Sequence, residues 1–455
     1  MVRITSSVIL ATLAATSAWA ASAPKCDADT KCPEKWPCCS QYGECGTGGY
    51  CLGGCDPLFS FSVDACAPEP ACKSKTYTWD NLDNAIKNND YHGDADKDDW
   101  VYSGDVKTED GNLLLTMPKN SAGTLVANNH YVWYGKISAK IKSSRGAGVV
   151  TGFILLGDTK DEIDYEFVGA DLSAVQTNWY FQGILDYGNG GNASVDSGDT
   201  FNNWHEYSID WKPESITWSV DGVAKRTLKR SDTWNETSNR FEYPQTPSRM
   251  QLSLWPAGQS SNAAGTIAWA GGEIDWNSED IQKTGYYYAT FGEVTVECYD
   301  PPKDSYSLGT KSYININEDG VEDSIRITNN NTVLASLGAT GLDMDLGGDN
   351  DDDNNNNSTE NTVPENHGGT GSEPGNSGGS TSSGNSDSSG GSSDSSDSSG
   401  SSDSSDSSND SSDFSQGNQD TSSTTGSSGA SSPNERVMQG SFFAVLVAIV
   451  VMVTL

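Results

Sequence analysis

Acidic and bulky apolar residues alternate along the segment 161–167, Asp-Glu-Ile-Asp-Tyr-Glu-Phe. Successive side chains of a β-strand point to opposite faces, so this pattern predicts a strand with Glu162, Asp164 and Glu166 together on one face. The run 149–156, which precedes it, is mostly apolar and is typical of a buried strand. The acidic strand is therefore expected to lie in the middle of a sheet rather than at its edge.

A row of three carboxylates gives a fold no structural gain, because like charges side by side repel one another. Two carboxylates that flank a glycosidic bond are what its cleavage requires, so the row indicates a glycosidase site. A strand separates the Cα atoms of Glu162 and Glu166 by about 13 Å, and their carboxyl groups come within the about 5 Å of a retaining enzyme only if the side chains lean together. This geometry leaves open which glutamate is the nucleophile. A solvated polar face and a calcium cluster are the competing interpretations.

The stretch between residues 101 and 296 contains many short apolar or alternating runs, separated by Gly, Asn and Asp, and hardly any helical periodicity. This pattern predicts an all-β domain of short strands. About 230 residues are enough for a single sandwich with its own core.

The segment 161–167, followed by Val168-Gly169 and Gln176-Thr177-Asn178, resembles the signature of glycoside hydrolase family 16. It is most similar to the fungal Crh-type cell-wall transglycosylases of that family. The resemblance implies a jelly-roll β-sandwich over residues 73–302, with a concave sheet that forms a long sugar-binding groove.

The resemblance also assigns roles to individual residues. It makes Glu162 the nucleophile, Asp164 the helper and Glu166 the general acid/base. Sugar rings stack on aromatic side chains and their hydroxyls bind amides, so glycan grooves combine both kinds of residue. On this basis four further residues are expected to contact substrate: Gln176, Asn178, Trp255 and Trp269. Three other tryptophans are assigned to the core: Trp204, Trp211 and Trp218.

Nine of the ten cysteines lie between residues 26 and 72, and Cys298 is distant from them. This density predicts a disulfide-stapled module over residues 21–72 and an oxidising compartment. The cysteine pattern resembles a hevein-type chitin-binding domain, which implies three bridges: Cys26–Cys39, Cys32–Cys45 and Cys38–Cys51. The pairing of the remaining four stays open: Cys55, Cys66, Cys72 and Cys298.

The hevein resemblance further implies that Ser40, Tyr42 and Tyr50 contact chitin. Glu44 stands where the pattern has an aromatic residue, and a carboxylate cannot replace a ring as a stacking platform. The module is therefore expected either to bind chitin or to serve as a structural cap on the enzyme.

Both ends of the chain carry signals for the cell surface. Residues 1–20 have the charge, apolar run and small residues of a cleavable secretory signal. The segment 430–455 ends in a short apolar tail and predicts a propeptide for glycosylphosphatidylinositol (GPI) attachment at Gly429, with Ser428 and Ala430 as alternatives. A stalk rich in Ser, Asp, Gly and Asn is expected over residues 343–429, after an extension of uncertain structure at 303–342. The protein is thus expected to be secreted and anchored at the cell surface and cell wall.

The net charge of −36 argues against nucleic acid and anionic lipid as partners, because a polyanion repels both, whereas a neutral polysaccharide is indifferent to charge. The four histidines show no metal-ligand spacing, and the sequence predicts neither a metal nor a cofactor. N-glycosylation motifs occur at six positions: Asn192, Asn235, Asn330, Asn356, Asn357 and Asn409.

The favoured function is an enzyme that cleaves chitin by a retaining double displacement and transfers it to β-glucan, which cross-links the wall. An endo-β-glucanase or chitinase that acts mainly by hydrolysis is one alternative. A non-catalytic glycan-binding wall protein is another, and it would be expected to lack Glu162 or Glu166. Both residues are present.

Overall fold

The computed structural model describes residues 23–303, 305–348 and 362–366. Its regular structure is almost entirely β-strand, and the α-helices in these ranges, α1 (Ala264–Trp269) and α2 (Glu279–Thr284), are six residues long. The prediction of an all-β fold is confirmed. None of the described helices has the length and apolar character needed to cross a membrane.

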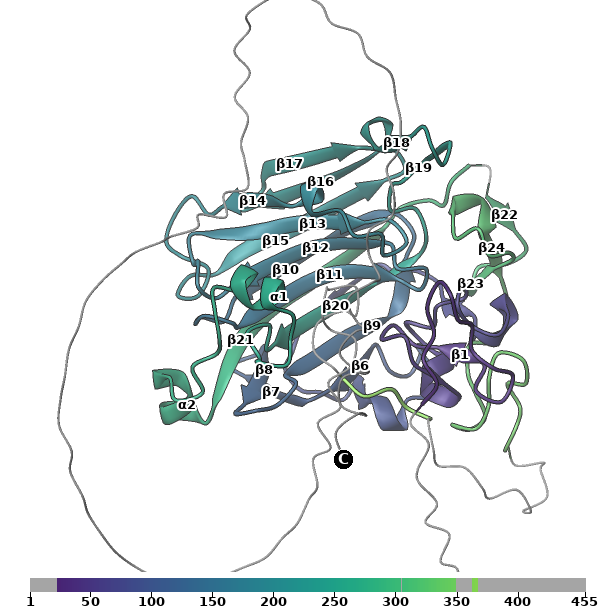
Figure 1. Cartoon of the computed structure of the whole chain (residues 1–455), viewed down its shortest axis with the longest axis horizontal. Helices are drawn as coiled ribbons and strands as arrows, with labels where there is room; N and C mark the ends of the chain where they lie inside the picture. Colours follow the sequence, from purple (N-terminus) through teal and green to yellow (C-terminus); the bar gives the residue numbers. More distant parts are fainter. Residues whose placement is uncertain (1–22, 304, 349–361, 367–455) are drawn as a thin grey trace, which may run out of the picture. The chain divides into compact units, whose positions relative to one another are not determined.

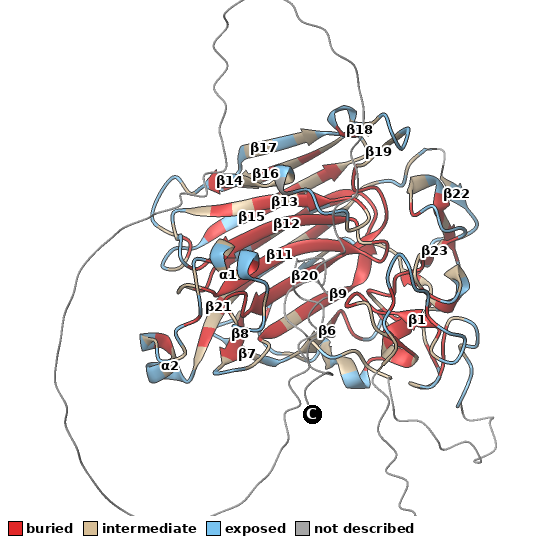
Figure 2. Ribbon diagram, in the orientation of Figure 1, coloured by how far each residue is buried: buried red, intermediate tan, exposed pale blue. Residues whose placement is uncertain are grey.

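Two eight-stranded sheets stack into a β-sandwich (Figure 1). In spatial order the first contains β17 (Val223–Lys229), β16 (Ser215–Val220), β15 (His205–Lys212), β10 (Gly135–Lys142), β21 (Tyr286–Cys298), β8 (Asn112–Pro118) and β7 (Asp105–Glu109), with β4 (Lys75–Tyr77) paired to β21. The second contains β14 (Gly191–Ser194), β13 (Ala174–Tyr180), β12 (Glu162–Val168), β11 (Val150–Gly157), β20 (Ser248–Trp255), β9 (Thr124–Val132), β6 (Trp100–Ser103) and β5 (Ala85–Lys87). Every residue of β11, β12 and β20 is buried, as Figure 2 shows for the middle of this sheet. The acidic strand is therefore central, as predicted.

The core lies between the two sheets and receives the apolar face of β12. The rings of Tyr165 and Phe167 make edge contacts with Tyr207 of the opposite sheet, at centroid distances of 5.5 and 4.7 Å. Trp218 Nε1 donates a hydrogen bond to the backbone oxygen of Asp164 at 2.9 Å. Because the apolar side chains of β12 point into this core, its carboxylates point to the other face of the sheet.

Two of the three tryptophans assigned to the core, Trp211 and Trp218, are fully buried. The assignment of Trp204 to the core is wrong, because its side chain is 41% exposed. It immediately precedes β15 rather than belonging to it, and its ring lies under Lys142, whose Nζ is 5.2 Å from the ring centroid.

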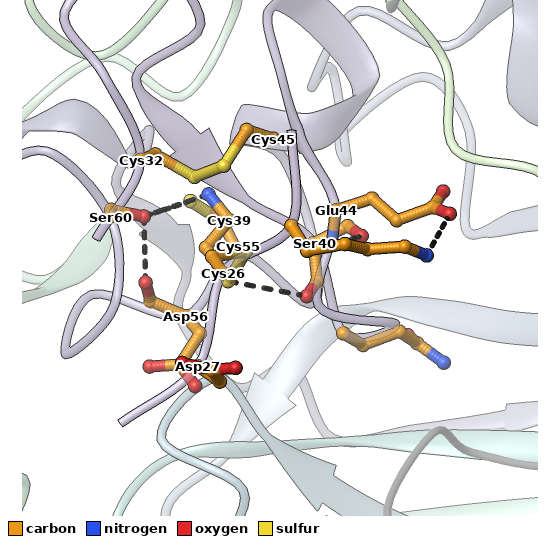
Figure 3. Close-up of a disulfide and its surroundings, with 12 residues drawn as sticks. Cys26, Asp27, Cys32, Cys39, Ser40, Glu44, Cys45, Cys55, Asp56 and Ser60 are labelled. Carbon is orange, nitrogen blue, oxygen red and sulfur yellow. Dashed lines mark hydrogen bonds and ion pairs between the residues drawn. A yellow bond between two sulfur atoms is a disulfide. The ribbon is translucent and has the colours of Figure 1, made fainter. Parts of the chain in front are cut away.

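The cysteine-rich module contains β1 (Cys38–Cys39), β2 (Cys45–Gly46) and the 3-10 turns η1 (Gly48–Cys51) and η2 (Val63–Ala65). Figure 3 shows Ser60 among its bridges, where the hydroxyl accepts from the amide of Cys39 at 2.9 Å and donates to the carbonyl of Asp56 at 2.6 Å. Three disulfides join the pairs that the hevein resemblance implied: Cys26–Cys39, Cys32–Cys45 and Cys38–Cys51. The pairs left open are joined as Cys55–Cys66 and Cys72–Cys298.

The segment after the sandwich folds back onto the module. Its strands β22 (Tyr306–Ser307), β24 (Ile325–Thr328) and β23 (Ser312–Asn315) form a small sheet with β3 (Glu69–Pro70). Hydrogen bonds continue beyond this sheet, since the amide of Gly48 donates to Ala339 and that of Gly341 to Ala65. The remaining short elements lie in loops: η3 (Asn88–Asp90), η4 (Tyr187–Asn189), η5 (Arg230–Thr233), β18 (Trp234–Asn235), β19 (Arg240–Phe241) and η6 (Glu322–Ser324).

Candidate active site

The three carboxylates of β12 occupy the face of the second sheet that is turned away from the core. Glu162 and Asp164 are fully buried and Glu166 is 5% exposed, so the three carboxyl groups lie in a largely water-excluded place. Low dielectric strengthens electrostatic effects on a substrate, and such burial is what acid/base and nucleophilic groups need. Sequence predicted both the strand and the shared face correctly.

The neighbouring strand β13 adds an amide beside each of two carboxylates. In register, Asn178 lies opposite Asp164, and Gln176 lies opposite Glu166. Residues paired across antiparallel strands share a face, so the two predicted amides do lie next to the carboxylate row. Asn178 Nδ2 donates to the hydroxyl of Tyr180 at 2.8 Å, and Tyr180 is itself the partner of Glu162.

The two predicted aromatic contacts, Trp255 and Trp269, lie together at the same face. Their rings stack at 6.1 Å with an interplanar angle of 27°. Trp269 Nε1 donates to Gln176 Oε1 at 2.7 Å, which joins this pair to the amides beside Glu166. Trp255 is 2% exposed, and its Nε1 has no hydrogen-bond partner among the described residues.

Sequence reasoning missed two polar residues of β20, Gln251 and Ser253. They alternate with the buried Met250, Leu252 and Leu254 and so share the face that carries the carboxylates. Within the described structure, Gln251 Oε1 and Ser253 Oγ are buried without hydrogen-bond partners. Orphan polar atoms on the floor of a site are suitable for ligand hydroxyls. The period-two pattern of the strand was the available signal.

Asp161 fixes the start of the acidic strand. Its carboxylate accepts hydrogen bonds from the amides of Gln182, Gln245 and Thr246 at 2.8 to 3.0 Å, and from the Thr246 hydroxyl at 2.9 Å. Burial raises the pKa of Asp161 to about 6, although these hydrogen bonds act in the opposite direction. The residue therefore holds the loops on both sides of β12 in place and does not face the carboxylate row.

The residues expected to bind chitin, Ser40, Tyr42 and Tyr50, are buried, with exposures of 2, 8 and 4%. They do not form a freely exposed binding face of the module. Glu44 accepts a hydrogen bond from Lys25 Nζ at 2.6 Å, beside Ser40 (Figure 3). Where the hevein pattern has an aromatic ring for sugar stacking, this chain thus has the Lys25–Glu44 ion pair, directly before β2.

The remaining predicted positions are dispersed. Asn192 and Asn330 are exposed, whereas Asn235 is half-buried and its Nδ2 donates to Glu242 Oε1 at 2.9 Å. The other predictions lie outside the described residues: the signal 1–20, the attachment site Gly429, the propeptide 430–455, and the acceptors Asn356, Asn357 and Asn409.

A sandwich with a row of three carboxylates, flanked by amides and stacked tryptophans, defines a glycosidase-type protein. Residues 94–271 match the family described as glycosyl hydrolases family 16. The chain is 68% identical, over the full length of both proteins, to Crh-like protein 2 of Aspergillus fumigatus. It is 54% identical to Crh-like protein 3 of Botryotinia fuckeliana, over 75% of this chain and 76% of that protein. A solved structure described as apo Crh5 transglycosylase is 30% identical and covers 60% of this chain and all of the other, with a TM-score of 0.48.

The chain belongs to the Crh-like proteins of glycosyl hydrolase family 16. It is an enzyme of the glycosidase and transglycosylase type, and its substrates are cell-wall glycans.

Proposed function

We propose that the enzyme cleaves chitin by a retaining double displacement and transfers the released chain to β-glucan. The carboxylate row on the central strand β12, with amides in register on β13, carries this proposal. Family membership supports a glycosidase fold with this row at its centre, and the intact glutamates argue against a non-catalytic wall protein.

In the first step Glu166 gives its proton to the glycosidic oxygen as the bond from the anomeric carbon to that oxygen breaks. Glu162 attacks the same carbon, and a covalent glycosyl-enzyme forms. In the second step an acceptor hydroxyl passes its proton to Glu166, and its oxygen displaces Glu162 from the sugar. Asp164, which lies between the two on the strand, acts as the helper by favouring the charge state that each step needs.

Transfer requires that an acceptor sugar reaches the intermediate before water does. Orphan polar atoms on β20 and the stacked Trp255 and Trp269 support sugar binding beside the carboxylates. Hydrolysis of chitin or of β-glucan is the competing outcome for the same intermediate.

We also propose how the enzyme reaches its substrate. Residues 1–20 and 430–455 have the features of a secretory signal and of a GPI propeptide. For this chain, removal of residues 1–20 and attachment of a GPI anchor at Gly429 would hold the enzyme at the membrane and wall. Replacing Gly429, Ser428 and Ala430 by bulky residues should release the enzyme into the medium, and undiminished retention at the surface would contradict the proposal.

Product analysis tests the reaction. The mature enzyme is incubated with chitin oligosaccharide and fluorescent laminarin oligosaccharide, beside the variant Glu162→Gln. Labelled hybrid products from the wild type alone would support the transfer. Shortened oligosaccharides without hybrids would indicate a hydrolase, and inactivity of both proteins would leave a binding protein.

A further inference from the structure

A cavity lies between the cysteine-rich module and the second sheet. Its floor consists of Val101 and Ser103 from β6 with Leu125 and Ala127 from β9. The module supplies its wall, chiefly the residues expected to bind chitin: Ser40, Tyr42 and Tyr50. Aromatic rings beside hydroxyl and amide groups suit a neutral sugar chain.

This cavity lies on the same face of the second sheet as the carboxylate row. One register row runs across the sheet from Asp164 through Ile154, Gln251 and Ala127 to Val101. The next row has the same direction and ends in two residues of the cavity floor: it contains Glu166, Gly152, Ser253, Leu125 and Ser103. Adjacent strands are about 4.8 Å apart, so the floor begins about 14 Å from the carboxylates. A glycan that lies across the strands would reach it.

The module is held firmly against the sheet and does not hang from it as a loose appendage. Arg249 Nη2 donates to the backbone oxygen of Gly53 at 2.7 Å, and Lys160 Nζ donates to that of Gln41 at 2.9 Å. Lys160 directly precedes Asp161, which fixes the start of the acidic strand. The cavity wall is therefore built into the same rigid frame as the catalytic strand.

A segment of the chain itself, residues 362–366, forms part of the cavity wall. The amide of Gly49 donates to the Thr362 carbonyl at 2.7 Å, and Asn88 Nδ2 is 3.4 Å from the Pro364 carbonyl. The Tyr42 hydroxyl lies 3.4 Å from Asn366 Oδ1, and Val363 and Pro364 line the cavity. A Cβ atom at Gly49 would lie 3.1 Å from the Thr362 oxygen, so a glycine permits this close approach.

We propose that this cavity is a glycan subsite on the sheet face that carries the carboxylates, and that residues 362–366 compete with the glycan for it. The choice of a neutral β-linked glycan as ligand rests on the proposed function. The segment offers carbonyl groups and an apolar proline ring to the polar groups and rings that a sugar would use. A glycan long enough to reach the module must therefore displace it.

Binding measured in the inactive Glu162→Gln background tests this, because it does not depend on turnover. The full mature chain with Val363→Gly and Pro364→Gly loses the apolar side chains with which the segment packs at the cavity wall. The dissociation constant of this variant for a labelled chitin or laminarin hexasaccharide should fall about fivefold or more. The reason is that the segment no longer blocks the cavity in part of the protein molecules, so a larger fraction of them can bind the glycan. Which of the two sugars gains identifies the glycan.

The exposed Glu365 provides the matched control, because Glu365→Gln changes the same segment outside the cavity and should leave the affinity unchanged. When Ser103→Tyr is added to the double glycine variant, the tyrosine ring fills the space above the cavity floor, and the increase in glycan affinity should disappear. Unchanged affinity in that variant, no binding by any form, or a gain that survives Ser103→Tyr would each overturn the inference. Hybrid formation by the enzyme with an intact Glu162 tests the proposed function separately.

Discussion

At the residue scale, the position of the carboxylate row depends on side chains outside the row. Asp161 is the clearest of these, because its buried carboxylate satisfies three amides and a hydroxyl from both flanking loops. The two glutamates of the row keep their positions only if the strand that carries them is fixed at its start.

Replacing Asp161 by alanine should therefore lower the free energy of unfolding by about 3 kcal/mol, because buried amides lose their acceptor. The kcat/KM should also fall under conditions in which the variant is still fully folded, so that the loss of stability does not account for it. Urea unfolding, with kcat/KM measured well below the midpoint, provides both readouts. The exposed Asp171, whose carboxylate accepts hydrogen bonds from Ser173, is the control for Asp→Ala substitution, and equal losses at both sites would refute the role.

At the element scale, strand β11 separates the acidic strand from β20 and needs a glycine to do so. Gly152 lies between Glu166 and Ser253 in the register, and a Cβ at this position would lie 2.4 Å from Ser253 Oγ. Either the serine or the strand has to move when a side chain is present.

The variant Gly152→Ala should thus be less stable by about 1 to 3 kcal/mol and should lose activity through displacement of Ser253 or Glu166. Thermal unfolding and initial rates measure the two effects. Among the described residues no atom lies within 4 Å of a Cβ at Gly265 in α1, so Gly265→Ala should keep the activity and should not lower the stability. A Gly152 variant that behaves like this control would show that the groove floor tolerates a methyl group.

The elements themselves could be predicted to different extents. Strand β12 was predictable because alternation is a local property, and the polar partners of β13 followed from the family resemblance. The docking of the module was not, because Arg249 and Lys160 bind backbone carbonyls of Gly53 and Gln41, and any residue has a carbonyl. Residues 362–366 lie within the range predicted as a stalk, and composition does not reveal that they contact Gly49.

At the scale of the whole molecule, the interface between module and sandwich contains several buried acids. Burial raises the pKa of Asp56 in the module to about 6. Burial also raises the pKa of Asp158, although the hydroxyl of Tyr131 and the charge of Arg249 act in the opposite direction. The pKa of Glu69 is raised by burial and, further, by the nearby Asp158. With Asp161 the folded chain thus holds protons that the unfolded chain has released.

Stability should consequently rise as the pH falls from 7 to about 5, because the folded state binds more protons than the unfolded state in this window. Below about pH 4 the unfolded carboxylates are protonated as well, and this gain is complete. Melting temperatures measured from pH 4 to 8 should therefore decline toward neutrality, and Asp158→Asn should flatten the decline. A melting temperature that increases from pH 5 to 7 would contradict the assignment of these buried acids.

The central claim is that Glu162 forms the bond to the sugar and Glu166 transfers the proton. The most direct measurement uses Glu166→Gln with a chitin oligosaccharide that carries an aryl leaving group, which departs without a general acid. Because the second step lacks its base, mass spectrometry should find one glycosyl chain per protein, and peptide mapping should locate it on Glu162. Sugar attached to another residue, or an unmodified protein that still releases the aryl group, would contradict the account.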